Sequence, residues 1–332
     1  MGSVHNINST SFLRFIAIIL IVNSHLDRLY PLSQLATGGA IGNALFFMLS
    51  GYGIVLSEQH QTRTFFPWYR RRIARIYPSL ILAVLFLFIL PGAAWRHWSA
   101  GDYVQYFIWP TPYWFISALM IFYVVFFILL KQRRPDFFLI GIGVLAIPYL
   151  FFYVTTVDLS RYSIEGPGYF KWIFYLQVMF LGGYMASKRI RFIKTNLVRD
   201  GLALLGCIAG YYGILLLVSK GYGGQFQAAT HLLMFPILFL FLKVSSSEVV
   251  TNRLMTAKYA GATISLVATL TLEIYLVHPS VYNQPALSNI LFPFNIVVFW
   301  IPVIILSFIL NRVSRLVTRR NPTETLAHHQ QK

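Results

Sequence analysis

The stretch SFLRFIAIILIVNSHLDRLY (residues 11–30) is apolar enough to cross a membrane, yet it contains Arg14 near its start and His25 near its end. At about 100° per residue, the step from Arg14 to His25 returns to nearly the same helix face, about 16 Å further along the axis. A cation and an imidazole on one stripe of a membrane helix are costly in lipid. The stretch therefore predicts a helix whose polar stripe faces a bundle interior or a polar cavity.

The composition of the whole chain points to the same class of protein. Of its 332 residues, 57% are hydrophobic and 11% are charged, whereas about a quarter of an ordinary globular chain is charged. We therefore expect an all-α, polytopic membrane protein. The net charge of +17 would indicate a nucleic-acid partner in a soluble chain, but here it indicates basic cytoplasmic loops, so no nucleic-acid partner is predicted. The single cysteine, Cys207, excludes an intrachain disulfide.

Apolar segments long enough to span a bilayer recur along the chain. If the N-terminus is cytoplasmic, 22 of the 27 Lys and Arg residues fall in cytoplasmic segments, and the bias alternates at every loop. This predicts about ten transmembrane helices with both termini in the cytoplasm, in the cytoplasmic (inner) membrane if the protein is bacterial. The predicted segments lie near residues 12–30, 38–57, 76–92, 113–130, 137–155, 170–187, 200–219, 227–243, 262–279 and 291–311.

No soluble block separates a second domain from these helices. We therefore expect one transmembrane domain over residues 1–320 and a short polar cytoplasmic tail over residues 321–332. The chain shows no internal repeat, and so it lacks the inverted repeats that many transporters carry.

Each polar residue of the first helix has two interpretations. His25, toward the outer end, is either a general base that deprotonates an acceptor hydroxyl or an interfacial histidine that tolerates lipid headgroups. Arg14 either lines a polar path on the His25 face or extends to the cytoplasmic surface as a snorkelling side chain.

Two later stretches combine polar groups with apolar or aromatic ones. In GNALFFMLSGYGIVLS (residues 42–57), Ser50 is either a hydrogen-bond donor to substrate or part of a small-residue helix contact. In RTFFPWYRRRIARIY (residues 63–77), Arg71, Arg72 and Arg75 form either an anion site for a phosphorylated cofactor or a basic anchor that meets anionic lipid.

The remaining candidates are Trp114, Glu273, Tyr275 and His278. Glu273 is a carboxylate inside a predicted span, which indicates a functional site or the neutralisation of a cation such as Arg14. His278 is expected at about the depth of His25. A histidine pair could bind a metal ion, but nothing else has ligand spacing, so no metal is predicted.

Taken in order, these motifs make the chain resemble the membrane acyltransferase 3 family from about Ser11 to Arg312. The matching positions are Arg14 and His25 in a basic-x10-His pattern, Phe46, Phe47, Ser50 and Gly51 in FFxxSG, Arg72 and Arg75 in RxxR, and Tyr275, Leu276 and His278 in YLxH. One pattern departs from the family. Many members carry Trp-x3-Glu-x3-Tyr on the fourth helix, whereas here Trp114 is followed by Ala118 and Phe122. If the family's glutamate takes part in acyl transfer, Glu273 is the residue that could act as an acid in its place.

The resemblance implies an integral-membrane O-acyltransferase that takes an acyl group from cytoplasmic acyl-CoA, in particular acetyl-CoA. The implied acceptor is a glycan or lipid-linked saccharide on the far side of the membrane. It also implies site roles: phosphate binding by Arg71, Arg72 and Arg75, a thioester path at Arg14, activation of the acceptor or acyl transfer at His25, an oxyanion donor at Ser50, and substrate contacts at Trp114, Tyr275 and His278.

Two rival interpretations remain. In the first, the protein is a transporter or flippase of a small anionic or lipid-linked solute, with Arg14, His25 and Glu273 as its relay. In the second, it is a family member without activity. The acceptor, the acyl chain length and the oligomeric state are left open by the sequence.

Overall fold

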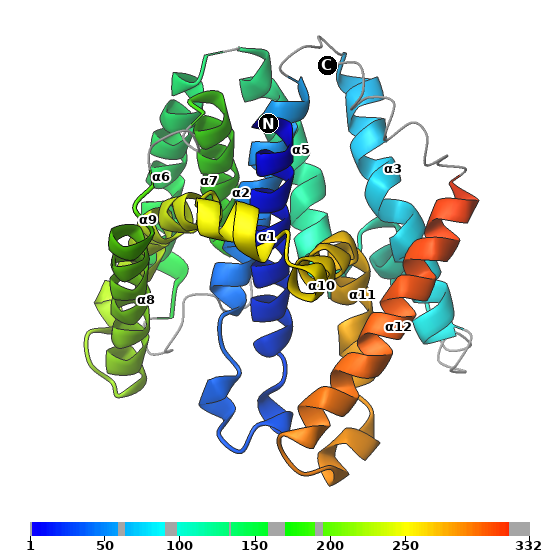
Figure 1. Cartoon of the computed structure of the whole chain (residues 1–332). Coiled ribbons are helices and arrows are strands. Elements are labelled where there is room, and N and C mark those ends of the chain that lie inside the picture. Colours follow the sequence, from blue (N-terminus) through cyan, green and yellow to red (C-terminus); the bar gives the residue numbers. More distant parts are fainter. Residues whose placement is uncertain are drawn as a thin grey trace. The chain divides into compact units, whose positions relative to one another are not determined.

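The computed structural model describes residues 2–58, 64–89, 98–132, 134–158, 170–189 and 195–318, and in these residues the chain is helical, with no β-strand. The predicted tail over residues 321–332 lies outside the described residues. The α-helices, labelled in Figure 1, are α1 (Gly2–Asn23), α2 (Gly39–Glu58), α3 (Phe65–Val84), α4 (Ala100–Tyr103), α5 (Trp114–Lys131), α6 (Asp136–Thr156), α7 (Phe170–Ser187), α8 (Leu197–Ser219), α9 (Ala228–Ser245), α10 (Lys258–Thr269), α11 (Thr271–Tyr282) and α12 (Phe294–Val317).

Short helical turns connect or extend these helices. The 3-10 turns are η1 (Asp27–Leu29), η2 (Ser33–Leu35), η6 (Thr111–Tyr113), η8 (Gly224–Phe226) and η10 (Pro285–Asn289), and the π-helical turns are η3 (Leu85–Ile89), η5 (Val104–Ile108) and η9 (Val249–Leu254).

Among the described residues, six helical segments are long and apolar enough to cross a membrane, and α10 with α11 makes a seventh if this pair, broken at Leu270, counts as one span. All ten predicted segments overlap helices, with residues 90–92 of the third lying outside the described residues, but α1, α3 and α7 are not among the six. The predicted count of ten is therefore not confirmed, and the orientation of the termini stays a prediction.

The first predicted helix is shorter than expected. The sequence pattern placed one helix over residues 12–30, but α1 ends at Asn23, and Ser24 and His25 lie in a turn. Ser24 Oγ donates to the Ile21 carbonyl at 2.7 Å, and such a local bond offers the backbone an alternative to continuing the helix. Arg14 and His25 therefore do not share one face of a continuous helix, and the prediction that they do was wrong.

The described chain forms two compact units, each assembled from separate stretches. The first unit contains residues 1–24, 37–63 and 118–268, and the second contains residues 25–36, 64–117 and 269–332. His25 therefore belongs to the second unit, whereas Arg14 belongs to the first.

In the first unit, α2 and α7 lie side by side in close contact (Figure 1). A Cβ added at Gly51 would overlap the Met179 carbonyl oxygen, and one added at Gly182 would overlap the Met48 carbonyl oxygen. Small residues allow two membrane helices to approach this closely. The packing interpretation of the Ser50–Gly51 segment thus has direct structural support.

A buried ion pair joins α8 to α9 in the same unit. Asp200 follows the N-cap Asn196, whose side chain accepts from the Arg199 amide. The Asp200 carboxylate lies 2.7 Å from Lys243 Nζ, with both side chains less than a tenth exposed. A buried charge needs such a partner. The pair therefore joins the start of α8 to the end of α9, which are the ends that the predicted topology places in the cytoplasm.

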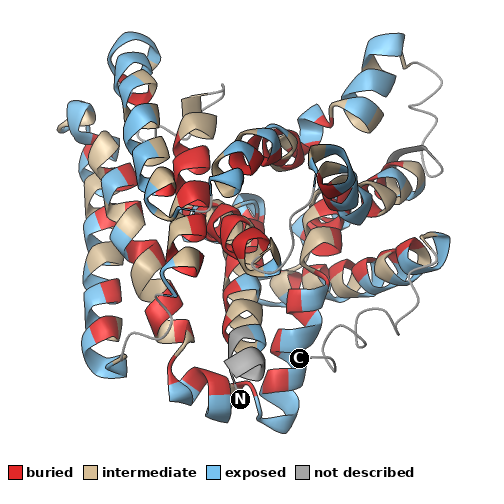
Figure 2. Cartoon of the chain, turned by 90° about the horizontal axis from the view of Figure 1, so that it is seen from above, coloured by how far each residue is buried: buried red, intermediate tan, exposed pale blue. Residues whose placement is uncertain are grey.

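Most helices have a buried stripe and an exposed side (Figure 2). On α6 and α8 the exposed side dominates. Only 17% of the most apolar 18-residue stretch of each helix is buried. An exposed surface of this size composed of apolar side chains is stable in contact with lipid, not water. These two helices therefore have the character of lipid-facing segments.

Candidate active site

Two histidines distant in the sequence meet in the second unit. The His25 ring lies in the turn after α1 and is exposed. Its centre is 5.0 Å from the centre of the His278 ring on α11, and Tyr275, one turn earlier on α11, lies 6.0 Å from His278. We call His25, Tyr275 and His278 the histidine site. The structure thus brings together three of the residues that the sequence singled out.

The hydrogen bonding of His278 defines its tautomer. His278 Nδ1 lies 3.1 Å from the Ile274 carbonyl oxygen. Because a carbonyl oxygen only accepts, Nδ1 is the donor, and in the neutral ring Nε2 is then an acceptor. His278 is 1% exposed, and its Nε2 has no hydrogen-bond partner among the described residues. The ring therefore presents a buried, unoccupied acceptor beside His25.

Aromatic side chains form the wall of the histidine site. Tyr113 is buried, and its hydroxyl donates to the Leu276 carbonyl at 3.1 Å. The rings of Tyr113 and Phe115 lie 6.0 Å and 5.7 Å from Tyr275. Tyr113 is not among the candidates that the sequence pattern selected. Its place next to the candidate Trp114 was the one available signal.

A polar clasp ties the His25 turn to the end of α11. Arg28 Nε donates to the Tyr282 hydroxyl at 2.9 Å, and its Nη2 donates to the Tyr282 carbonyl at 2.8 Å. The same hydroxyl donates to Asp27 Oδ1 at 2.5 Å. Tyr282 is four residues after His278, so both lie on one face of α11. The clasp therefore holds the turn that carries His25 against the helix that carries His278.

Glu273, also on α11 in the second unit, has hydroxyl partners. Its side chain is 4% exposed and accepts from Ser79 Oγ on α3 at 2.9 Å, and Ser79 Oγ also lies 3.1 Å from Ser314 Oγ on α12. The carboxylate thus joins α11 to α3 and α12. Its catalytic assignment stays a prediction, and Ser79 is a contact that no sequence pattern revealed.

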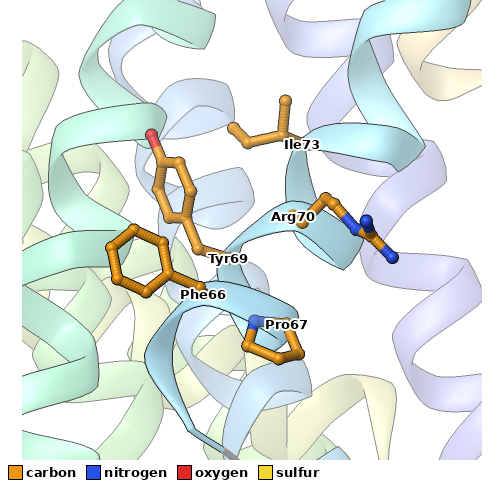
Figure 3. Close-up of a pocket in the computed structure, with 5 residues that line it drawn as sticks. All are labelled: Phe66, Pro67, Tyr69, Arg70 and Ile73. Carbon is orange, nitrogen blue, oxygen red and sulfur yellow. The ribbon is translucent and has the colours of Figure 1, made fainter.

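The arginine cluster is divided between two environments on α3. Arg72 is 8% exposed and lies over the Trp68 ring, with its guanidinium carbon 5.4 Å from the ring centroid. Arg71 and Arg75 are exposed. Beside them, an open groove of about 440 Å³ is lined by Phe66, Pro67, Tyr69, Arg70 and Ile73 (Figure 3). The groove uses Arg70, which the sequence analysis did not select.

The remaining candidates are Arg14 and Ser50 in the first unit and Trp114 in the second. In the first unit, Arg14 is exposed on α1, and Ser50 Oγ donates to the Phe46 carbonyl of its own helix at 2.9 Å. That bond occupies the proton that an oxyanion donor would need. Trp114 begins α5, and Ala118, at the position of the family's glutamate, is fully buried.

The described residues contain no group of three or more His, Cys, Asp or Glu side chains placed to hold a metal ion. Several long apolar helices and a buried imidazole beside a polar turn define a multi-pass integral membrane protein with a candidate proton-transfer site.

The comparison with protein families identifies the class of this membrane protein. The family model described as an acyltransferase domain matches residues 7–312 of the 332 residues. The chain therefore belongs to the acyltransferase 3 family, as its motifs indicated. No curated protein and no solved structure matches the chain. Family membership assigns a membrane acyltransferase activity.

Proposed function

We propose that this acyltransferase moves an acetyl group from cytoplasmic acetyl-CoA to a hydroxyl group of a carbohydrate or lipid-linked saccharide across the membrane. The observation that supports the proposal best is the pairing of His25 with His278. An exposed imidazole beside a buried acceptor nitrogen suits general-base catalysis of hydroxyl attack, because the buried group can orient the base.

In the proposed mechanism, His25 meets the acceptor and His278 positions it. A separation of 5.0 Å between the ring centres is short enough for one N–H···N hydrogen bond between the imidazoles. His278 Nε2 has no hydrogen-bond partner among the described residues, so the proposed bond forms when the exposed His25 ring turns on binding of the acceptor. One nitrogen of His25 then donates to Nε2, and the other faces the acceptor hydroxyl. His278 thus orients His25 in the way that a third group orients the base of a catalytic triad.

The reaction balances without any additional reactant. His25 takes the proton of the acceptor hydroxyl, and the oxygen forms a bond to the thioester carbonyl carbon. The tetrahedral intermediate collapses as the C–S bond breaks. The CoA thiolate then takes the proton back from the His25 imidazolium, and the products are the ester and free CoA. The alternative, in which His25 carries the acyl group, uses the same residue as a nucleophile.

The basic part of α3 is the proposed contact for the CoA phosphates. Arg71 and Arg75 are exposed, and exposed guanidinium groups can bind phosphate through paired hydrogen bonds. Arg72 is more enclosed, because it lies over Trp68, and we assign it to the inner edge of the same phosphate site. The predicted topology places this end of α3 in the cytoplasm, where acyl-CoA is found.

The test uses the purified full-length protein in lipid nanodiscs with radiolabelled acetyl-CoA and surface glycan from the source organism. We expect labelled glycan and free CoA from the parent and a 10²–10⁴-fold lower rate from His25→Ala, as is usual for loss of a general base. Undiminished transfer by His25→Ala would refute the mechanism. Loss of O-acetyl groups from the glycan on deletion of the gene would identify the acceptor.

Binding of CoA separates this proposal from the transporter alternative, because a transporter of another solute has no need to bind it. Arg75→Ala is expected to weaken CoA binding, and an affinity equal to that of the parent would remove the phosphate role. Arg14, Ser50, Trp114 and Glu273 stay predicted site residues, and single alanine variants in the same transfer assay test each of them.

A further inference from the structure

The groove on the first half of α3 has the dimensions of a small-molecule site. Its volume is about 440 Å³, and ligand pockets commonly enclose about 300–1,000 Å³. It opens to the surface, and the side chains that line it come from successive turns of one helix (Figure 3). The catalytic steps proposed above do not use it.

One edge of the groove is aromatic. Phe66 is 81% exposed, and its ring centre lies 5.5 Å from that of Phe65, which in turn stacks on Tyr69 at 5.3 Å. The cluster therefore presents an ordered aromatic surface at the groove. Aromatic faces of this kind bind nucleobases by stacking, whatever the base.

The other edge is cationic. In Figure 3 the Phe66 and Tyr69 rings lie together on one side of the helix, and the Arg70 guanidinium extends from the other side. The exposed Arg71 and Arg75 add positive charge to the same helix. A nucleotide carries its base and its phosphates at opposite ends, so an aromatic edge and a separate cationic edge match the two ends of such a ligand.

We propose that this groove binds the adenine nucleotide end of acyl-CoA, with the base on Phe66 and Tyr69 and a phosphate at Arg70. The inference rests on the proposed function, because the donor must be a CoA thioester. It adds a recognition site for the 3′-phospho-ADP group, which is remote from the thioester that reacts.

The binding test uses adenosine 3′,5′-bisphosphate and the full-length protein in nanodiscs of neutral lipid. We expect Phe66→Ala and Arg70→Gln each to weaken binding about tenfold, through loss of stacking and of a charge-assisted hydrogen bond. Because Phe66 is mostly exposed, its removal should leave the fold intact. The matched controls are Tyr259→Ala, an aromatic residue that is 79% exposed, and Arg253→Gln, an exposed arginine. Both should bind like the parent.

A second measurement compares acetyl-CoA with acetyl-pantetheine, which lacks the nucleotide. Phe66→Ala should raise the KM for acetyl-CoA about tenfold and leave the kinetics with acetyl-pantetheine unchanged. Equal losses with both donors, or parental binding of the bisphosphate by Phe66→Ala, would overturn the inference. Bisphosphate binding that appears only with anionic lipid, and does not depend on Phe66, would make the groove a lipid site and would also overturn it.

The two proposals fail in different ways. If the parent binds the bisphosphate through Phe66 but transfers no acyl group, the groove is upheld and the proposed function is refuted. If the parent transfers acetyl groups and Phe66→Ala does so with an unchanged KM for acetyl-CoA, the groove alone is refuted.

Discussion

Replacing His278 with two different amides tests whether it positions His25 or only supports the fold. In His278→Asn, the amide nitrogen takes the place of Nδ1 and can keep the bond to the Ile274 carbonyl, which is 3.1 Å long in the parent. The acceptor at the Nε2 position is lost. In His278→Gln, the longer side chain can place an amide oxygen near the Nε2 position and accept from His25, but it gives up the bond to Ile274.

The expected magnitude follows from the bond that each variant keeps. The proposed His25–His278 hydrogen bond becomes charge-assisted when His25 takes the proton, and such a bond contributes about 1.5–3 kcal/mol. His278→Asn should therefore lower kcat by about 10–100-fold, with the KM for acetyl-CoA unchanged. His278→Gln should stay within about threefold of the parent, because it retains an acceptor for the imidazolium. A purely structural residue predicts the opposite order, since the asparagine variant keeps the buried bond.

The assay is transfer of radiolabelled acetyl groups to glycan, with thermal unfolding measured on the same samples. The matched control is His231→Asn in the first unit, where the Tyr149 hydroxyl lies 2.9 Å from Nδ1 of this buried histidine. Its kcat should equal that of the parent. If the two residues act as a unit, His25→Ala combined with His278→Asn should be no slower than His25→Ala alone. A kcat for His278→Asn equal to or above that of His278→Gln would refute the reasoning.

Three further predictions concern packing and stability. Gly51→Ala should lower the free energy of unfolding by about 1–3 kcal/mol, because the added methyl group overlaps the facing helix; Gly53→Ala, which meets nothing within 4 Å, should not, and equal effects would contradict the helix contact. Ser79→Ala removes the buried donor to a carboxylate and should cost about 1–3 kcal/mol; an unchanged unfolding midpoint in detergent would argue against that bond. Lys243→Met should lower Tm because the buried Asp200 then keeps only the more exposed Arg199 as a cation partner, at 3.0 Å, whereas Lys243→Met combined with Asp200→Leu should recover much of the loss; a double variant as unstable as the single one would contradict this account.

The amino-acid pattern predicted where most helices lie, because hydropathy is a local property of each segment. Each predicted span overlaps a helix, although the span over residues 262–279 falls on two helices, α10 and α11, and the motifs pointed to the family that the comparison then confirmed. The pattern was wrong about the end of the first helix. Its apolar and polar residues continue a helical period past Asn23, but the side chain of Ser24 bonds to a backbone carbonyl, and the chain turns.

The candidate site was only partly predictable, for a physical reason. Glu273 was noticed because a carboxylate in a membrane helix is costly, but its partner Ser79 is an ordinary serine on another helix. Tyr113 and Phe115 were not selected from the sequence, and their contacts with Tyr275 are seen only in the folded chain. Such partners leave no trace in the composition of their own segment.

By itself, the sequence determined that this is a helical membrane protein, that it belongs to the acyltransferase 3 family, and that a few polar residues need a protected environment. The family follows from the order and spacing of the motifs, and the other two conclusions depend on the free energy of moving single residues from water into lipid, which each segment shows on its own. Only the tertiary structure decided that His25 leaves the first helix and meets His278, and that one arginine of the α3 cluster is enclosed while its neighbours are exposed. Those features depend on how distant helices pack, and packing is a property of the assembled chain.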